Sequence, residues 1–531
     1  MLSQGNRKMG RGRRGRGSHP FAAEIEPLEQ RQLLSATPSP TALNPYDIRT
    51  YYGFSNIQFT YTKVIETRFG PVVHTFTTPG DGTGETIAIV VADADPNIAS
   101  DLAAFDKEYN LPPANLTVDS QFTTATDPTG NEEFEESLDV EWAHAMAPGA
   151  NIVVVNRVDS IKGLLNAVSA AANYPGVSVV STSTGATEFS GELADESYFA
   201  NPTNHGGINV SFVTASGDDK STEGPGPLFP SVLPNVLSVG GTVLTLSPIG
   251  GSEQSWDDSE GGPSEYIAEP RYQEFAQQTG DRTTPDVSFA ATNYAVYDTF
   301  PVLSSKTNQL ETLDWATGDG TSFGAPEWAG LLAIANQGRS LIGEPTLSDV
   351  PSVMYALPSS DFNDITTGPA NREGYSPGPG YDEITGLGSP KAYLIAQALL
   401  HPPLVLFPPF DAAAAGNTTG SSSTPQIARD AASSLVSPIN ADALSDPSGA
   451  NTASAAPVAA SEGNEADAPT SGSTVTAQSP SASGRPSLPL EDAAANTTPG
   501  GGSWGGHSDS SLNAESVQWS GLNAALDMLS T

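Results

Sequence analysis

The segment Thr86-Ile87-Ala88-Ile89-Val90-Val91-Ala92 is a continuous apolar run without a charged or turn-forming side chain. A short run of this kind is typical of a strand that is buried on both faces of a sheet. Further short runs of the same character follow it, and we predict strands there too. They are Leu116 to Val118, Asn151 to Val155, Val177 to Ser181, Asn209 to Thr214 and Val236 to Val243.

Segments with helical spacing alternate with these strands. The helices that we expect are Asn97 to Tyr109, Glu132 to Ala147, Ser160 to Tyr174 and Ser389 to Leu399. Residues 260–310 are predicted to be loop-rich, with order at Pro285-Asp286-Val287 and from Asn293 to Tyr297. Strands that alternate with helices predict an α/β fold with a mostly parallel central sheet and helices on both faces. The active site of such a sheet lies beyond the carboxyl ends of its strands.

The composition excludes several classes of protein. The 531 residues contain no cysteine, which rules out thiol chemistry, thiolate metal sites and disulfides. A formal net charge of -39 argues against nucleic acid and anionic membranes as partners, because Lys and Arg bind both. No apolar run approaches the ~20 residues of a membrane-spanning helix. A strongly acidic surface loses charge as pH falls, so the composition is compatible with an acidic working environment.

The two ends of the chain differ from residues 44–402, which we expect to form the folded domain. Residues 1–40 begin with a basic arm and lack the apolar core of ~7–15 residues that a standard signal peptide carries. They contain Leu28-Glu29-Gln30-Arg31-Gln32-Leu33-Leu34-Ser35, which resembles the Leu-Glu-x-Arg-x-Leu-Leu-Ser sorting segment of certain bacterial envelope and secreted proteins. This resemblance implies export, and a disordered basic arm is the alternative. Residues 403–531 are predicted to be a low-complexity, largely disordered acidic tail, in which Val517 to Leu529 has the pattern of a short amphipathic helix.

A glycine-rich segment, Thr317-Gly318-Asp319-Gly320-Thr321-Ser322-Phe323-Gly324-Ala325-Pro326, precedes a further helical pattern. We expect Gly318 and Gly320 to permit a backbone turn that a side chain would hinder, and the proline to lie in the first helical turn. Ser322 would then sit at a helix N-terminus, where backbone donors and the helix dipole favour a nucleophile. The alternative is that Thr321 or Ser322 is only a helix cap.

A serine nucleophile needs a base, and histidine is a poor candidate in this chain. There are six histidines, none in the His-Gly-Thr setting of a subtilisin, and His144 between two alanines is predicted to be structural and partly buried. Glu135 and Asp139 are four residues apart, so their carboxylates share one face of the predicted helix. If they are buried they would titrate as a coupled pair that shares a proton at low pH. The alternative is an acidic first helical turn that faces water.

A third carboxylate follows the strand predicted up to Thr214. Asp218 comes after the turn that begins at Gly217, which puts it at the carboxyl end of a central strand. A protonated aspartic acid in such a place can donate a hydrogen bond to a developing oxyanion. An Asx-turn is the alternative.

Together these segments resemble the sedolisin family of serine-carboxyl peptidases, and its kumamolisin-like members in particular. Gly320-Thr321-Ser322-x-x-x-Pro326 is similar to the nucleophile motif of the family. Glu135-x-x-x-Asp139 is similar to the helix with the catalytic carboxylates, and Ala215-Ser216-Gly217-Asp218 to the segment with the oxyanion aspartate. The resemblance covers about residues 44–400 in the order of the family and includes Ala147-Pro148-Gly149-Ala150, Val239-Gly240-Gly241-Thr242 and Pro285-Asp286-Val287.

The resemblance implies a subtilisin-like fold and endopeptidase activity on proteins or peptides at acidic pH. The roles that it implies are Ser322 as nucleophile, Glu135 as general base and then acid, Asp139 as the residue that orients Glu135, and Asp218 as oxyanion donor. It also implies one structural calcium ion, with Asp364, Ile365, Gly378, Gly380 and Asp382 as ligands. Two carboxylates with backbone carbonyls suit calcium, although turn formation also explains these residues. No organic cofactor is implied, and we expect a monomer that is secreted or held at the cell envelope.

The chain departs from the family pattern at several positions. Asn44-Pro45-Tyr46 already resembles the start of a mature domain, so we expect no large amino-terminal pro-domain. Thr184 stands where the family often has Trp, Val91 where kumamolisin-like proteins have a further Glu, and Asp219-Lys220 where a small pair is usual. The expected lack of a pro-domain and the long acidic tail favour an alternative function, a catalytically weak or inactive protein-binding module at the cell envelope. The presence of Ser322, Glu135, Asp139 and Asp218 opposes it. A conventional subtilisin is a third hypothesis, disfavoured because no histidine is suitably placed.

Overall fold

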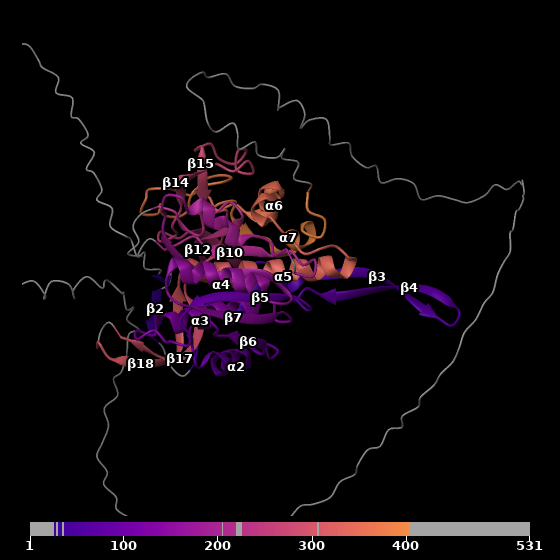
Figure 1. Cartoon of the computed structure of the whole chain (residues 1–531), viewed down its shortest axis with the longest axis horizontal. Helices are drawn as coiled ribbons and strands as arrows, with labels where there is room; N and C mark the ends of the chain where they lie inside the picture. The colour runs from indigo at the N-terminus through magenta and orange to yellow at the C-terminus, as the bar shows by residue number, and fades with distance from the viewer. Residues whose placement is uncertain are drawn as a thin grey trace, which may run out of the picture. The chain divides into compact units, whose positions relative to one another are not determined.

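The computed structural model describes residues 37–203, 205–218, 226–304 and 307–403, together with the backbone of two short strands, β1 (Glu26–Pro27) and β2 (Gln30–Leu33) (Figure 1). The rest of the basic arm, Asp219-Lys220, the tail from residue 404 and the predicted helix at 517–529 lie outside the described residues. In the part of the chain that is described, no helix has the length and apolar character needed to cross a membrane.

The centre of the fold is an eight-stranded sheet with the order β13-β12-β10-β8-β5-β7-β6, in which β16 also pairs with β12. All pairings in it are parallel except that of β12 with β13. The strands predicted from apolar runs are all present, within a few residues at their ends. The sheet consists of β5 (Thr86–Ala92), β6 (Asn115–Asp119), β7 (Asn151–Arg157), β8 (Val177–Thr182), β10 (Ser211–Ala215), β12 (Val236–Ser247), β13 (Gly250–Ser255) and β16 (Val287–Ala290).

Helices cover both faces of this sheet, as the alternating pattern predicted. Along β5, Ile87 and Ile89 point into one apolar cluster and Ala88 and Val90 into the other, because successive side chains of a strand point to opposite faces. The first cluster also holds α2 (Ile98–Tyr109), α3 (Asn131–Met146) and α5 (Gly324–Ile342), and the second holds α4 (Ile161–Asn173). The fold is therefore a subtilisin-like α/β sandwich of three layers.

The prediction that residues 260–310 are loop-rich is wrong. This region contains β14 (Gly262–Ala268), β15 (Asp281–Thr284) and β17 (Tyr294–Leu303), and β18 (Leu310–Asp319) follows and pairs with β17. These strands lack long apolar runs because they pair outside the central sheet and have mixed burial. The final helix, α7 (Ala392–Ala398), is also shorter than predicted, since Ser389–Pro390 forms β20 instead.

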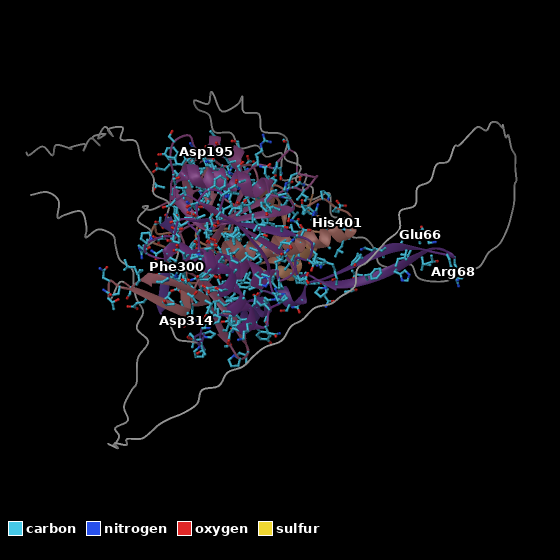
Figure 2. All side chains as sticks on the ribbon, turned by 60° about the horizontal axis from the view of Figure 1, so that its bottom comes forward. Glu66, Arg68, Asp195, Phe300, Asp314 and His401 are labelled. Carbon is cyan, nitrogen blue, oxygen red and sulfur yellow. The ribbon has the colours of Figure 1, made fainter. Side chains whose placement is uncertain are left out.

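A hairpin of β3 (Gln58–Thr67) and β4 (Gly70–Pro79) extends from the domain, and the sequence analysis did not anticipate it. Figures 1 and 2 show it running away from the sheet, with Glu66 and Arg68 at its tip. The remaining short elements are α1 (Pro45–Tyr51), β9 (Thr184–Thr187), β11 (Leu228–Phe229), α6 (Val350–Ala356), β19 (Phe362–Asn363) and the 3-10 turns η1 (Phe54–Asn56), η2 (Glu192–Phe199), η3 (Thr321–Phe323) and η4 (Ser359–Asp361).

Candidate active site

Helix α3 carries the two predicted catalytic carboxylates, and it is an interior helix. Every residue of α3 except Asn131 is buried, and Glu135 and Asp139 are 3% and 0% exposed. The alternative of an acidic helical turn facing water is therefore wrong. The helix is buried because α2, α5 and β17 pack around it, and the indole of Trp142 donates a hydrogen bond to the Ala295 carbonyl of β17 at 3.0 Å.

Asp139 is joined to the nucleophile segment by one hydroxyl group. The Oγ of Ser183 lies 2.6 Å from Oδ1 of Asp139 and 3.2 Å from the carbonyl oxygen of Ser322. Burial raises the pKa of Asp139 to about 8, and the hydrogen bond from Ser183 opposes this shift only in part. The Ser183 hydroxyl donates to Asp139 and lies within hydrogen-bond distance of the Ser322 carbonyl as well. Asp139 and the segment that bears Ser322 thus belong to one buried polar group, and Glu135 is buried one helical turn before Asp139 on α3.

The segment from β18 into α5 places Ser322 in the single turn η3, immediately before the helix. The N-cap residues of η3 and α5 are Gly320 and Phe323, so neither Thr321 nor Ser322 occupies the N-cap position of a helix there. The expected glycine turn is also wrong. Gly320 has an extended backbone with φ 169°, and Gly318 lies in β18, where a Cβ would come within 2.7 Å of the Phe323 ring. Close packing, and not a turn, excludes a side chain at position 318.

Asp218 is bonded to the residue that precedes the nucleophile. Its Oδ1 accepts hydrogen bonds from the backbone N–H of Thr321 at 2.9 Å and from the Thr321 hydroxyl at 2.8 Å. The Thr321 hydroxyl in turn accepts from the Gly217 N–H at 3.3 Å. Since Oδ1 accepts two bonds, a proton on this carboxyl group would be carried by Oδ2. Asp218 therefore connects the end of β10 to the nucleophile turn across 103 residues of sequence.

His144 has the structural role that we predicted. It is fully buried on α3, and its Nε2 lies 2.8 Å from the Pro112 carbonyl and 3.2 Å from Oδ1 of Asp106. These contacts tie α3 to the end of α2. The Ser183 hydroxyl, and not this imidazole, contacts the nucleophile segment.

Other buried carboxyl groups on α3 were missed by the sequence analysis. Glu136 is fully buried, and its Oε2 accepts from the Asp95 N–H at 3.0 Å and from the Asn156 side chain at 2.8 Å. Burial raises the pKa of Glu136 well above its ordinary value. The density of acidic residues in α3 was visible in the sequence, but their burial was not.

Two departures from the family pattern have local explanations. Thr184 is buried, and its hydroxyl accepts a hydrogen bond from the buried guanidinium of Arg157 at 2.9 Å. Val91 lies in β5 and belongs to the same apolar cluster as α3. Position 184 therefore supplies a polar partner for Arg157, and position 91 supplies an apolar side chain to the core.

The predicted calcium ligands lie in one loop region. The Gly380 N–H contacts both oxygens of Asp364, at 3.1 and 3.2 Å, and the Gly378 N–H donates to Oδ2 of Asp382 at 2.9 Å. Asp382 is buried and also accepts bonds from the loop that follows it. The carboxylates of Asp364 and Asp382 are the hard-oxygen ligands that calcium prefers, and the loops that carry them could add backbone carbonyls. The residues present therefore fit a calcium ion.

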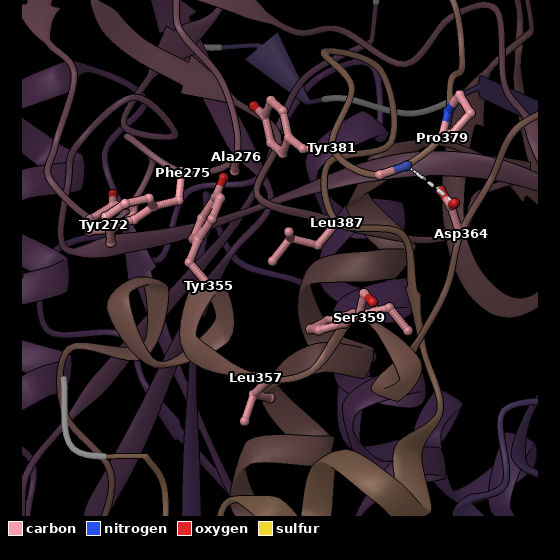
Figure 3. A pocket seen from close by; sticks show the side chains of 12 residues that line it. Tyr272, Phe275, Ala276, Tyr355, Leu357, Ser359, Asp364, Pro379, Tyr381 and Leu387 are labelled. Atoms are coloured by element: carbon pink, nitrogen blue, oxygen red, sulfur yellow. Dashed lines mark hydrogen bonds between the residues drawn. The ribbon is translucent and has the colours of Figure 1, made fainter. Parts of the chain in front are cut away.

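A pocket of about 560 Å³ borders this loop, and Figure 3 shows Asp364, Pro379 and Tyr381 on its wall. None of the four predicted catalytic residues lines it. It is thus separate from the site around Ser322.

A second group of carboxylates lies elsewhere. Among the described residues, Asp95, Asp101 and Asp298 have oxygens within 4.8 Å of one another. The carboxylate of Asp101 is already bonded to the Thr299 N–H at 2.8 Å and to the Thr299 hydroxyl at 2.9 Å. Hydrogen-bond donors of the protein thus already occupy the carboxylate oxygens of one member of this group.

Comparisons with known proteins find relatives in sequence and in fold. The Subtilase family matches residues 125–350. Kumamolisin from Bacillus sp. (strain MN-32) is 32% identical over 351 residues, which are 60% of this chain and 61% of kumamolisin. Tripeptidyl-peptidase sed4 from Aspergillus fumigatus is 27% identical over 373 residues, 57% of this chain and 60% of that protein. The chain thus spans about three fifths of the length of these curated relatives.

The solved structure of Pseudomonas sedolisin, a serine-carboxyl proteinase complexed with two molecules of pseudo-iodotyrostatin, has the same fold. The TM-score is 0.52 at 20% sequence identity, over 68% of this chain and 98% of that chain. The chain is therefore similar in sequence to kumamolisin and to tripeptidyl-peptidase sed4, and it shares its fold with sedolisin.

Proposed function

We propose that this protein is a serine-carboxyl endopeptidase that hydrolyses peptide bonds of proteins at acidic pH. The observation that carries the proposal is the position of Ser183, whose hydroxyl contacts both Asp139 on α3 and the backbone of Ser322. A carboxylate helix and a serine-bearing turn that share a buried hydroxyl group have the parts of a nucleophile with its base. The similarity to kumamolisin and to tripeptidyl-peptidase sed4 supports the same reaction class.

In the proposed reaction, the Ser322 Oγ attacks the scissile carbonyl carbon while Glu135 accepts the hydroxyl proton. Asp139 orients Glu135 and holds its own proton in the buried site. Asp218, protonated on Oδ2, donates a hydrogen bond to the oxyanion, because its Oδ1 is already held by Thr321. Glu135 then returns the proton to the leaving amine, and the acyl-enzyme is hydrolysed by water through the same steps.

The pH range of activity follows from these protonation states. A neutral Asp218 and a coupled pair on α3 that holds one proton are both favoured at low pH. Burial, which raises the pKa of Asp139 to about 8, keeps the proton of Asp139 on the enzyme through the acidic range. Activity is therefore expected to fall as the solution approaches neutrality.

A calcium ion, when bound, would cross-link the loop of Asp364 to the loop of Asp382. Both carboxylates, with the carbonyls of Ile365, Gly378 and Gly380, would hold it. It would supply stability to the domain at residues 44–402 and no chemical group to the reaction. We propose further that the protein is secreted or held at the cell envelope, as the sorting-like segment at residues 28–35 implies, and that it works as a monomer.

The test is hydrolysis of an unfolded protein by the full chain between pH 3 and 8. We expect activity at acidic pH that is abolished in Ser322→Ala and in Glu135→Gln, with both variants still folded by circular dichroism. His144→Ala should retain activity per folded molecule, because its Nε2 has polar contacts with Asp106 of α2 and with the Pro112 carbonyl in the loop after it. A folded, calcium-loaded protein without activity at any pH would refute the proposal and favour the protein-binding module.

A further inference from the structure

Three tyrosine rings form one side of the pocket that borders the predicted calcium loop. Figure 3 shows Tyr272, Tyr355 and Tyr381 on that side, with Ser359 and Asp364 opposite them. The ring centroids of Tyr272 and Tyr355 lie 5.2 Å apart, and those of Tyr355 and Tyr381 lie 6.0 Å apart. The pocket therefore offers a row of aromatic rings on one side and polar side chains on the other.

The hydroxyl groups of these tyrosines are already bonded to the domain. Tyr272 and Tyr381 donate to backbone carbonyls at 2.7 and 3.1 Å, and Tyr355 donates to Oδ1 of the buried Asp286 at 3.0 Å. These bonds fix the three rings and use the one hydrogen that each phenol can donate. A ligand in the pocket would thus contact these residues chiefly through their rings.

An aromatic row of this kind suits a proline-rich segment in the polyproline II conformation. Proline has no backbone N–H, so it can lie against an aromatic ring without leaving a donor unsatisfied. Polyproline II rises ~3.1 Å per residue, so two residues advance ~6 Å, close to the spacing of the tyrosine rings. Grooves lined by aromatic side chains commonly bind proline-rich segments, because the conformation that they recognise is already formed.

The chain itself supplies such a segment directly after the last described residue. Leu404-Val405-Leu406-Phe407-Pro408-Pro409 is apolar at every position. Pro408-Pro409 is the one pair of adjacent prolines in the sequence after residue 403. The sequence thus places one candidate for the pocket at the start of the acidic tail.

This segment begins close to the pocket. Lys391, just before α7, donates from its N–H to the Asp361 carbonyl at 2.9 Å and from Nζ to the Ser360 carbonyl at 2.8 Å, one residue from the pocket wall. Ten residues lead from Lys391 through α7 to His401, and at the helical rise of 1.5 Å they advance ~15 Å. The next seven residues can span ~24 Å when extended. Pro408 can therefore return to the pocket.

We propose that the pocket binds Pro408-Pro409 of the same chain, and that this contact fixes the start of the acidic tail on the domain. The segment is tethered through His401, so it acts at a high effective concentration and needs only a weak intrinsic affinity. None of the candidate catalytic residues lines the pocket, so the inference is independent of the proposed peptidase function.

The first experiment places a photo-crosslinker at the pocket of the full chain, in a Ser322→Ala background. The residue to replace with p-benzoylphenylalanine is Phe275, which lines the pocket and is 83% exposed, so the change is compatible with folding. We expect a crosslink to residues 404–409, located by mass spectrometry. In a mixture of 15N-labelled and unlabelled chains, both halves of each crosslinked pair should carry the same label. The same replacement of Phe69, an equally exposed ring beside Arg68 at the tip of the hairpin in Figure 2, is the control and should give no such crosslink.

A matched pair of substitutions tests whether the pocket itself holds the segment. Ser359→Arg puts a long side chain into the pocket, and it should lower the yield of the crosslink to residues 404–409 at least about tenfold. Ser360→Arg makes the same change one residue away, outside the pocket lining, and should leave the yield unchanged. Both serines are exposed, so both variants should fold, which circular dichroism checks.

The second experiment measures binding of a fluorescent peptide of residues 401–409 in the same Ser322→Ala background. The full chain with Pro408→Gly and Pro409→Gly should bind it, because these substitutions empty the pocket. The chain with its prolines intact should bind it at least about tenfold more weakly, because its own segment competes at a high effective concentration. A peptide with glycine in place of both prolines should bind to neither chain.

Several results would overturn the inference. Mixed labels in the crosslinked pairs would show that the occupant belongs to a second copy. The absence of a crosslink to residues 404–409, a yield that Ser359→Arg leaves unchanged, or equal binding of the peptide by the two chains would show that the pocket does not hold this segment. Both experiments are done without catalysis, so failure of the chain with Ser322 to hydrolyse proteins would refute the proposed function alone.

Discussion

Replacement of Glu327 by glutamine should make the free energy of unfolding less dependent on pH. Glu327 is fully buried on α5, and its Oε2 accepts a hydrogen bond from the Tyr294 hydroxyl at 3.1 Å. Its Oε1 has no hydrogen-bond partner among the described residues. Burial raises the pKa of Glu327 well above its ordinary value, and the bond from Tyr294 opposes this only in part. The helix N-terminus favours the charged form by only about 0.3–1 kcal/mol, less than the several kcal/mol that desolvation of an ion costs.

The magnitude follows from proton linkage. The folded protein keeps the Glu327 proton at pH values where the unfolded chain, with an ordinary glutamate pKa near 4.5, has released it. This stabilisation is complete below that pH and is lost at about 1.4 kcal/mol per pH unit as the pH rises toward the folded-state pKa. Glutamine has a similar volume and no proton to lose. Between pH 5 and 7 the free energy of unfolding of Glu327→Gln should therefore gain about 3 kcal/mol relative to the parent.

The assay is urea unfolding at 25 °C between pH 5 and 7, in a Ser322→Ala background that prevents self-digestion, with calcium in excess. The amide of the variant lacks a partner for part of its hydrogen-bonding capacity, which adds a cost that does not vary with pH. Glu108→Gln on the exposed face of α2 is the matched control and should show no such slope. A difference between Glu327→Gln and parent that stays constant across this range would refute the reasoning, because Glu327 would then titrate alike in the folded and unfolded chains.

Three further predictions concern the hydroxyl of Ser183, a buried ion pair and the calcium loop. Ser183→Ala removes a hydrogen bond that lowers the pKa of Asp139. The limb of the pH profile of kcat/KM that reports Asp139 should therefore move up by about 1–2 pH units. An unchanged profile would show that the hydrogen bond from Ser183 does not set the pKa of Asp139. Asp286→Asn removes the charge that pairs with the buried Arg282 through bonds of 2.6 and 2.7 Å, and it should lower the free energy of unfolding by about 3–5 kcal/mol. A loss of less than about 1 kcal/mol in urea unfolding, the size expected for an exposed pair, would contradict this reasoning. Removal of calcium with a chelator should lower the Tm of the parent. Asp364→Asn should abolish the dependence of the Tm on calcium, and Asp95→Asn should preserve it. The reverse pattern would assign the ion to the group of Asp95, Asp101 and Asp298.

The buried strands of the central sheet could largely be predicted from local sequence patterns. Runs such as Thr86–Ala92 are apolar at every position because β5 is covered on both faces, and that requirement acts on each residue separately. Strands outside the central sheet were not readable in this way. β17 and β18 are stabilised by pairing with each other, and half-buried strands of this kind have no run that distinguishes them from loops.

The candidate active site likewise has some properties that are local in sequence and others that depend on the tertiary structure. The spacing of Glu135 and Asp139 on one helical face, and the position of Ser322 before a helix, are local properties that the sequence by itself determined. Whether those carboxylates face water or the interior depended on α2, α5 and β17, which are remote in sequence. The hydroxyl of Ser183 and the carboxyl group of Asp218 reach the nucleophile segment from more than 100 residues away. Only the tertiary structure decided these contacts, because a pKa and a hydrogen bond depend on what surrounds a group in space, and the neighbours of these groups come from distant parts of the chain.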